Sequence, residues 1–328
     1  MSIQKDIILT KSSLSSKSTT IYVRDSTAMS ILTRIGIFVI LRGLHELVWF
    51  LWAHFWRTSD IESYLQTKDG KASWAMVTNA SDAIGEGFAD KLASLGFNVV
   101  LHDRDPYMLS RTRARLERKY PKNTFRTSIM NWQLPVDGAH TSFSEIKATV
   151  EDINLKVLIN NPINDAPNTY GSMDRNSPKQ LADMITSLAV FHIQISSVLI
   201  RQLARNGPSL VINVVPTANT GVPTHASSRA LLMRSTVELS LEDRVMRREV
   251  EVLGLKAGNV ALNTEGSIFC PSVERFVEAA LAKVGCGRVL VIPYWAHVIQ
   301  SWAARLVPEA VSEILQVELM SRRYRKHK

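Results

Sequence analysis

The chain has 328 residues, 45% of them apolar, which is enough to bury the core of one large or two ordinary globular domains. This composition excludes wholesale disorder and fibrous repeats, and two cysteines, Cys270 and Cys286, exclude a disulfide framework and suit a reducing compartment. The formal charge of +9 gives little reason to expect a nucleic-acid partner, because five positive residues lie in the last seven positions: Arg322, Arg323, Arg325, Lys326 and Lys328.

Two segments precede the first predicted strand. Residues 1–28 are rich in Ser and Thr without an apolar period, so we predict a mobile tail. Residues 29–57 carry apolar residues at steps of three and four and are predicted to form a hydrophobic helix that spans a membrane or lies on it. Arg42 and Glu46 are four positions apart and can pair, which reduces the cost of insertion. The alternative is a helix packed on its own domain or on a partner.

Residues 72–267 alternate between short apolar strands and helical stretches. The strand-like runs are WAMVTNA, NVVLH, LKVLINN near 155–161 and SLVINVV near 209–215, with helices expected at 84–95 and 180–204. This alternation predicts a Rossmann-type α/β fold, a doubly wound parallel sheet with helices on both faces. Residues 268–328 are predicted to form a C-terminal helical extension with a basic tail, in which Trp295 and Trp302 favour an interfacial location.

The first strand runs into TNASDAIG, residues 78–85. A strand, a tight loop and a helix N-terminus are typical of a dinucleotide site, because backbone amides and the helix dipole face the phosphates. Such loops need glycine where the backbone turns or approaches the phosphate closely, yet Asn79 and Ala83 stand where glycine is expected. The candidate cofactor contacts in this loop are Thr78, Asn79, Ser81, Ile84 and Gly85.

The run from Ser73 to Arg104, the segment LINNPIN and the C-terminal motif PYWAH together resemble the short-chain dehydrogenase/reductase superfamily. The most similar group is the fungal very-long-chain 3-oxoacyl-CoA reductases, which are 17-beta-hydroxysteroid dehydrogenase-like. The resemblance implies NADP as cofactor and a role in fatty-acid elongation at the endoplasmic reticulum membrane, with the folded domain facing the cytoplasm. Arg325 and Lys326 resemble a dilysine retrieval signal of that compartment; the alternative is a charge run near anionic lipid.

The remaining cofactor contacts are altered or ambiguous. Asp103 and Arg104 end the second strand, where an acid usually binds the ribose of NAD and a base accommodates the phosphate of NADP; the resemblance favours NADP through Arg104. It also places Asn131 at an adenine-contacting aspartate, keeps Asn160, and places Ile163 at a glycine. The loop after the sixth strand reads KAG, without the usual proline.

The catalytic residues of the family are all replaced. Its mechanism transfers hydride from NADPH to a ketone, while a tyrosine gives the proton and a lysine, a serine and an asparagine assist. The resemblance puts His225 at the tyrosine and Arg229 at the lysine, and Arg229 is also a candidate cofactor contact through a ribose or a phosphate. The serine position falls on Pro216 or Val215, and the asparagine position falls on Leu188 or Thr186.

Two functions of different class follow. The first is a pseudoenzyme that keeps the fold and the membrane address and binds an acyl-CoA, another lipid, a nucleotide or a protein partner in fatty-acid elongation. The alternative is an active NAD(P)H-dependent ketoreductase on a lipid or polyketide carbonyl that uses His225 and Arg229. The nearby Arg229 is expected to lower the pKa of His225, which makes the imidazole a poorer acid at neutral pH. No metal site is expected, since neither His-Glu-x-x-His nor paired Cys-x-x-Cys occurs.

Overall fold

The computed structural model describes residues 18–66, 70–130, 136–162, 176–217, 223–262 and 265–326. The chain forms two units, one ending at Trp52 and the other spanning Ala53–Lys328. Helix α1 (Ser18–Leu51) makes up the described part of the first unit. Residues 18–28 are therefore helical, which corrects the predicted tail over 1–28. Once an apolar helix exists, extending it is cheap, because each added residue brings its own hydrogen bond.

Helix α1 is apolar on all sides over the stretch Ile37–Leu41. The five consecutive residues Ile37–Leu41 are apolar and each is more than half exposed. Because successive residues of a helix are about 100° apart, these five residues cover its whole circumference. Arg42 and Glu46 form the expected ion pair, at 3.1 Å. Two stretches, Met29–Trp56 and Pro178–Arg205, are long and apolar enough to cross a membrane, but the second is 56% buried, as expected of a core helix.

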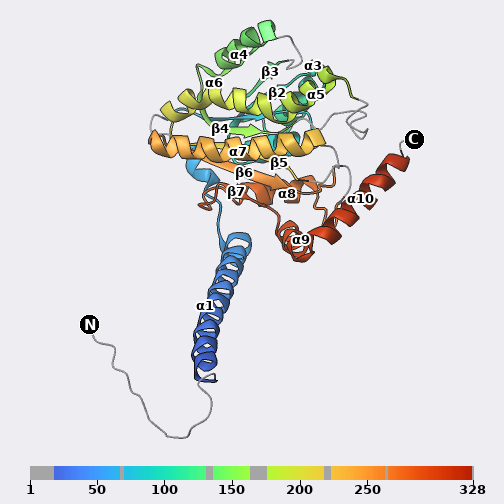
Figure 1. The fold of residues 1–328 in the computed structure, drawn as a ribbon. Helices are drawn as coiled ribbons and strands as arrows, with labels where there is room; N and C mark the ends of the chain where they lie inside the picture. The colour runs from blue at the N-terminus through green and yellow to red at the C-terminus, as the bar shows by residue number, and fades with distance from the viewer. Residues whose placement is uncertain are drawn as a thin grey trace. The chain divides into compact units, whose positions relative to one another are not determined.

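A seven-stranded parallel sheet forms the centre of the second unit, in the order β3-β2-β1-β4-β5-β6-β7 (Figure 1). Both faces of a parallel sheet are covered by crossover helices, which explains why its strands are continuous apolar runs. The strand order reverses between β1 and β4, the point at which such sheets bind ligands beyond the carboxyl ends of the strands. The strands are β1 (Ser73–Thr78), β2 (Asn98–Asp103), β3 (Phe125–Ile129), β4 (Asn154–Asn160), β5 (Ser209–Pro216), β6 (Val250–Ala257) and β7 (Leu290–Val291).

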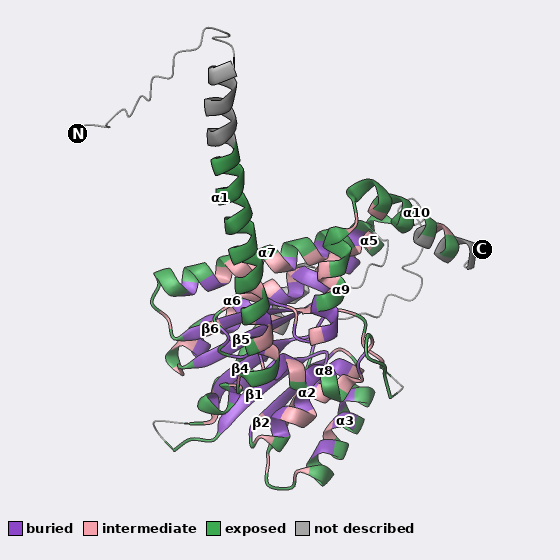
Figure 2. Ribbon diagram, turned by 90° about the horizontal axis from the view of Figure 1, so that it is seen from below, coloured by how far each residue is buried: buried purple, intermediate pink, exposed green. Residues whose placement is uncertain are grey.

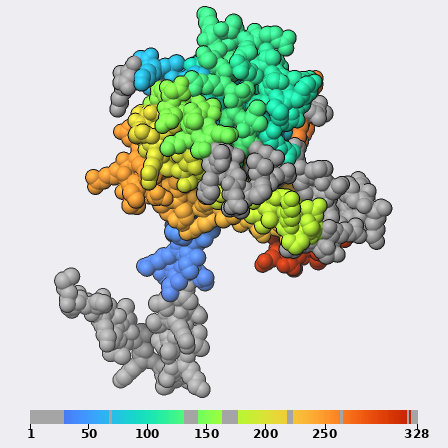
Figure 3. All heavy atoms as spheres, turned by 90° about the horizontal axis from the view of Figure 1, so that it is seen from above, coloured from blue at the N-terminus to red at the C-terminus, as the bar shows by residue number. Residues whose placement is uncertain are grey.

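Helices cover both faces of the sheet, which confirms the expected Rossmann-type fold. Figure 2 shows the strands buried and the outer sides of the helices exposed. Figure 3 shows one face of the molecule, with the teal residues near position 100 at the top and the orange residues near position 240 lower down. One layer contains α2 (Ala83–Ser94), α3 (Pro106–Lys119) and α8 (Val273–Leu281). The other contains α4 (Val136–Val150), α5 (Pro178–Ile185), α6 (Phe191–Arg205) and α7 (Pro223–Val245).

The sheet continues past residue 267, where we predicted the Rossmann domain to end. Strand β7 pairs with β6 in the register Gly254 to Leu290, and α8 packs against α2. A Cβ on Gly254 would lie 2.5 Å from Cδ2 of Leu290, so the glycine permits this approach. A two-residue strand is too short to produce a recognisable sequence pattern. The C-terminal helices α9 (Trp295–Leu306) and α10 (Glu309–Lys326) follow β7.

The segment from Ala53 onward is bound to the end of α8, and it includes the one-turn 3₁₀ helix η2 (Ile61–Leu65). Lys283 Nζ donates to the carbonyl oxygen of Ala53 at 2.5 Å, and Arg57 Nη1 donates to that of Ala282 at 3.0 Å. Burial lowers the pKa of Lys283 to about 8. Residues 53–57, which we predicted as the end of the membrane helix, therefore belong to the second unit.

Candidate functional site

The loop between β1 and α2 keeps the turn of a dinucleotide-binding loop despite its missing glycines. Asn79 has φ of 49°, the left-handed conformation that glycine usually supplies and that asparagine tolerates better than most residues. A Cβ on Gly85 would collide with the carbonyl oxygen of Asn79, so this glycine is needed for the close packing of α2 on the loop. Ile84 is buried, and its side chain contributes to the core.

The N-terminus of α2 offers partial room for a pyrophosphate. The N-cap residue Asp82 makes no side-chain cap hydrogen bond, so the first amides of the helix are not taken up by it. The Ser81 hydroxyl is buried and has no hydrogen-bond partner among the described residues, which suits a phosphate oxygen. Ala83 places a methyl group where the resemblance expects a glycine that lets the backbone approach the pyrophosphate. The residues of this loop therefore fit the pyrophosphate of the cofactor, although the Ala83 methyl leaves less space for it than a glycine would.

The carboxylate of Asp103 braces this loop from the end of β2. Its Oδ2 accepts a hydrogen bond from the backbone N–H of Ser81 at 3.0 Å, and its Oδ1 accepts from those of Arg104 and Asp105 at 2.6 and 3.4 Å. The residue is 5% exposed. Backbone N–H groups therefore already bind the carboxylate that would otherwise accept hydrogen bonds from the ribose hydroxyls of NAD. The half-buried Arg104 is the next residue in the chain.

Asn161 joins the two loops at the switch point. Its backbone N–H donates to Thr78 Oγ1 at 2.9 Å, and its side-chain amide donates to the carbonyl oxygen of Asn79 at 3.3 Å. The Asn79 amide in turn donates to the carbonyl oxygen of Pro162 at 3.3 Å. The side chains of Thr78 and Asn79, which we predicted to contact the cofactor, therefore hold the crevice together.

The Asn160 side chain lies in the core rather than in the crevice. Its amide donates to Ser196 Oγ at 2.9 Å and to Asn213 Oδ1 at 2.7 Å, and the Asn213 amide donates to Thr236 Oγ1 at 2.8 Å. This buried polar chain links β4, β5, α6 and α7. Successive side chains of a strand point to opposite faces, so Asn160 and Asn161 cannot share one role.

The positions assigned to the catalytic serine and asparagine carry no equivalent group. Val215 is buried in β5, and Pro216 ends that strand. Leu188 and Thr186 lie in a π-helical turn, Thr186–Val190, between α5 and α6. Such turns are frequent at functional sites. The backbone deformation is therefore present where the resemblance expects the asparagine, but its side chains are a buried leucine and a threonine.

His225 and Arg229 lie one turn apart on α7. Arg229 Nη1 donates to the carbonyl oxygen of Thr217 at 3.1 Å, so the guanidinium holds the chain that leaves β5. His225 Nε2 is buried and has no hydrogen-bond partner among the described residues. Burial, and then the charge of Arg229, lowers the pKa of His225, so the ring is neutral at pH 7 and a poor proton donor.

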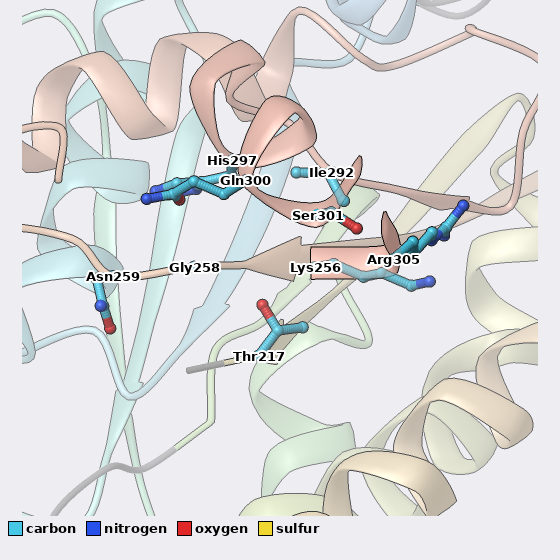
Figure 4. A pocket seen from close by; sticks show the side chains of 9 residues that line it. All are labelled: Thr217, Lys256, Gly258, Asn259, Ile292, His297, Gln300, Ser301 and Arg305. Atoms are coloured by element: carbon cyan, nitrogen blue, oxygen red, sulfur yellow. The ribbon is translucent and has the colours of Figure 1, made fainter. Parts of the chain in front are cut away.

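A pocket of about 350 Å³ lies at the carboxyl ends of β5 and β6, beside α9 (Figure 4). Lys256 of the KAG segment and His297 of the PYWAH motif both line it. A Cβ on Gly258 would lie 2.7 Å from His297 Nδ1, so this glycine makes space for the ring. Sequence reasoning missed Ser301 and Arg305, although their spacing of four on the polar side of α9 was a signal.

Two predicted positions, Asn131 and Ile163, lie outside the described residues. Within the described ranges, no group of three or more His, Cys, Asp or Glu side chains is placed to hold a metal ion.

The chain is similar to fungal reductases along most of its length. It is 28% identical to a very-long-chain 3-oxoacyl-CoA reductase of Mycosarcoma maydis over 251 residues, which are 72% of this chain and 70% of the relative. A very-long-chain 3-oxoacyl-CoA reductase of Emericella nidulans is 24% identical, with 81% of this chain and 82% of the relative covered. No protein-family model matches the chain.

Solved structures with the same fold are more distant in sequence. A ketone-specific alcohol dehydrogenase from Comamonas testosteroni superposes with a TM-score of 0.58 at 18% identity, covering 72% of this chain and 95% of that one. A short-chain dehydrogenase from Sphingobium yanoikuyae in complex with NADPH also has a TM-score of 0.58 at 18% identity, covering 76% and 95%. The sheet topology and these superpositions show that the chain has the fold of the short-chain dehydrogenases, and its sequence is similar to those of the very-long-chain 3-oxoacyl-CoA reductases.

Proposed function

We propose that the chain is a catalytically inactive relative of the very-long-chain 3-oxoacyl-CoA reductases. The observation that carries this proposal is the state of α7, where the tyrosine position holds a neutral His225 and the lysine position holds an Arg229 bound to a backbone carbonyl. A neutral imidazole is a weak acid, so the carbonyl oxygen of a ketone would receive no proton from it at pH 7. The side chains at the serine and asparagine positions provide no replacement.

We propose further that the loop between β1 and α2 still binds NADP, with lower affinity than a glycine-containing loop. The turn at Asn79, the buried Ser81 hydroxyl and the uncapped amides of α2 favour binding, and the Ala83 methyl opposes it. The engaged carboxylate of Asp103 favours NADP over NAD. Solved structures of similar fold contain NADP or NADPH. When bound, this cofactor supplies hydride chemistry; this chain's own contribution is to hold the phosphates and the ribose.

A membrane location at the endoplasmic reticulum, with the sheet domain on the cytoplasmic side, is part of the proposal. The part of the apolar stretch that lies in α1, residues 29–51, rises about 35 Å as a helix, which exceeds the hydrocarbon thickness of a bilayer. The apolar circumference of α1 favours a span over a surface helix, and the pairing of Arg42 with Glu46 lowers the cost of two charges. An acyl-CoA, another lipid, or a protein of fatty-acid elongation is the proposed partner.

One observation favours a second candidate function, an active NAD(P)H-dependent ketoreductase. His225 Nε2 is buried without a hydrogen-bond partner among the described residues, which leaves it able to contact a substrate oxygen. In that function Arg229 would stabilise negative charge on the oxygen.

An assay of the purified full chain in detergent separates the two functions. NADPH oxidation is followed with a long-chain 3-oxoacyl-CoA in three proteins: the unchanged chain, His225→Phe, and His45→Gln as a matched control on α1. We expect no turnover above background in any of them. Turnover that His225→Phe abolishes and His45→Gln preserves would establish the second function, and turnover in all three would equally refute inactivity.

A further inference from the structure

The pocket beside α9 carries unbalanced positive charge. Lys256 at the end of β6 and Arg305 in the last turn of α9 line the same cavity, and their side chains extend next to each other in Figure 4. None of the described residues that line the pocket has a carboxylate. Neither cation forms an ion pair or hydrogen bond with another described residue. Two like charges therefore face one cavity without a fixed counter-ion among the described residues.

The other polar groups of the pocket suit an anion. Ser301 contributes a hydroxyl and Gln300 a side-chain amide, and both groups are able to donate hydrogen bonds to phosphate oxygens. Burial, and then the charge of Arg305, lowers the pKa of Lys256. An anion bound between the two cations would remove this repulsion and restore the charged form of the lysine. Burial also lowers the pKa of His297, so this ring adds no third charge at pH 7.

Apolar surface lies next to Arg305 on the same helix, α9. Leu306 directly follows Arg305 and is 85% exposed, and Ile299 is 41% exposed. A ligand whose charged group is held by Arg305 would bring an attached hydrocarbon chain against this surface. Burying it from water is favourable by roughly 25 cal/mol per Å².

We infer that this pocket binds the phosphate group of an amphiphilic ligand, with Lys256 and Arg305 holding the phosphate and the apolar side of α9 contacting the hydrocarbon part. The inference rests on the acyl-CoA or lipid partner of the proposed function and assigns it a binding site. It needs neither a bound nicotinamide nor a catalytic side chain, so ligand binding can fail without changing the outcome of the turnover assay. The phosphate has two sources, a phospholipid in the bilayer or a soluble phosphate ester that carries an acyl chain.

Equilibrium binding to the full chain in detergent or nanodiscs tests the inference. The probes are palmitoyl-CoA, nanodiscs containing phosphatidic acid, inorganic phosphate, and palmitate as an amphiphile without phosphate. The test protein is the double variant Lys256→Met with Arg305→Gln. The matched control is Lys179→Met with Arg201→Gln, two exposed cations outside the pocket, which changes the net charge equally.

We expect at least one phosphate-bearing amphiphile to bind roughly tenfold or more weakly to the pocket variant, and equally to the control. Pocket-dependent binding of palmitoyl-CoA identifies a soluble source, and pocket-dependent binding confined to phosphatidic acid identifies the bilayer. Three results would overturn the inference. Palmitate could bind as tightly as the phosphate-bearing amphiphiles, the control variant could lose as much affinity as the pocket variant, or neither amphiphile could bind in a pocket-dependent way. Inorganic phosphate that binds as tightly as the amphiphiles would overturn the role of the apolar surface of α9.

Discussion

The backbone N–H of Ser81 donates a hydrogen bond of 3.0 Å to the carboxylate of Asp103, across 22 residues of chain. This contact fixes the candidate phosphate loop to the end of the neighbouring strand. The same carboxylate also accepts from the N–H of Arg104 at 2.6 Å, so a single buried side chain sets the conformation of both sides of the cofactor crevice.

We therefore expect Asp103→Asn to lower the free energy of unfolding by about 1 to 3 kcal/mol, because the amide NH₂ would face backbone donors and leave one unsatisfied. Urea unfolding of the full chain in detergent measures the change. The control is Asp152→Asn, an exposed carboxylate paired with Arg126, which should lower the free energy of unfolding much less. Equal losses in the two variants would contradict the bracing role of Asp103.

Ala83→Gly should strengthen NADPH binding by about tenfold, because it removes the methyl group at the position where the pyrophosphate approaches the backbone. Asn79→Gly is the matched comparison. It should change affinity much less, since Asn79 already adopts the left-handed conformation. Fluorescence titration of NADPH measures both, and an unchanged affinity in Ala83→Gly would show that this methyl does not limit binding.

Gly85→Ala should lower the free energy of unfolding by roughly 1 to 3 kcal/mol, because its new methyl group meets the carbonyl oxygen of Asn79. Thermal and urea unfolding measure this loss. Gly43→Ala is the control, since Gly43 has open space around it in helix α1. A Gly85→Ala protein as stable as the unchanged chain would mean that the helix and the loop separate without cost.

Acid should destabilise the sheet domain below pH 6.5. Burial lowers the pKa of His102 and of His192 to about 4, so both are neutral in the folded chain. The unfolded chain takes up these protons first, near pH 6.5, so the stabilisation is complete above that pH and is lost as the pH falls to 4. The difference amounts to on the order of 3 kcal/mol per histidine.

His102→Phe tests this pH dependence, because His102 stacks on Phe191 at 5.3 Å and a phenyl ring preserves that contact. The free energy of unfolding, measured from pH 7 to pH 4, should fall less steeply in this variant. His45→Gln, an exposed residue of α1, should leave the slope as it is. If His102→Phe left the pH dependence of the free energy of unfolding unchanged, the acid sensitivity would come from other groups.

The full chain should remain in the membrane pellet after carbonate extraction if α1 spans the bilayer. Val39→Lys with Ile40→Lys should release it, since each central lysine costs about 2.5 to 3.5 kcal/mol on insertion scales. Val245→Lys with Met246→Lys replaces two exposed apolar residues at the end of α7 and should have no such effect. If carbonate released the unchanged chain from the membrane, α1 would lie on the membrane surface instead of spanning the bilayer.

The sequence predicts the sheet, the loop and Gly85 because alternating apolar runs and a strand-loop-helix pattern are local properties. It does not predict β7, whose two residues depend on pairing with β6. The positive φ of Asn79 and the core position of Asn160 also depend on contacts far along the chain. The Lys256 and Arg305 pocket was missed for the same reason, since about 50 residues separate two cations that share one cavity.

The polar chain from Asn160 through Asn213 to Thr236 crosses the core without using any position assigned to catalysis. Replacing either amide by an apolar group would leave buried polar atoms without partners, so the framework depends on these residues. The positions that the resemblance assigns to catalysis are not among them. Stability and reaction chemistry are thus encoded at separate positions, so the side chains at the positions assigned to catalysis can be exchanged one at a time without redesigning the core.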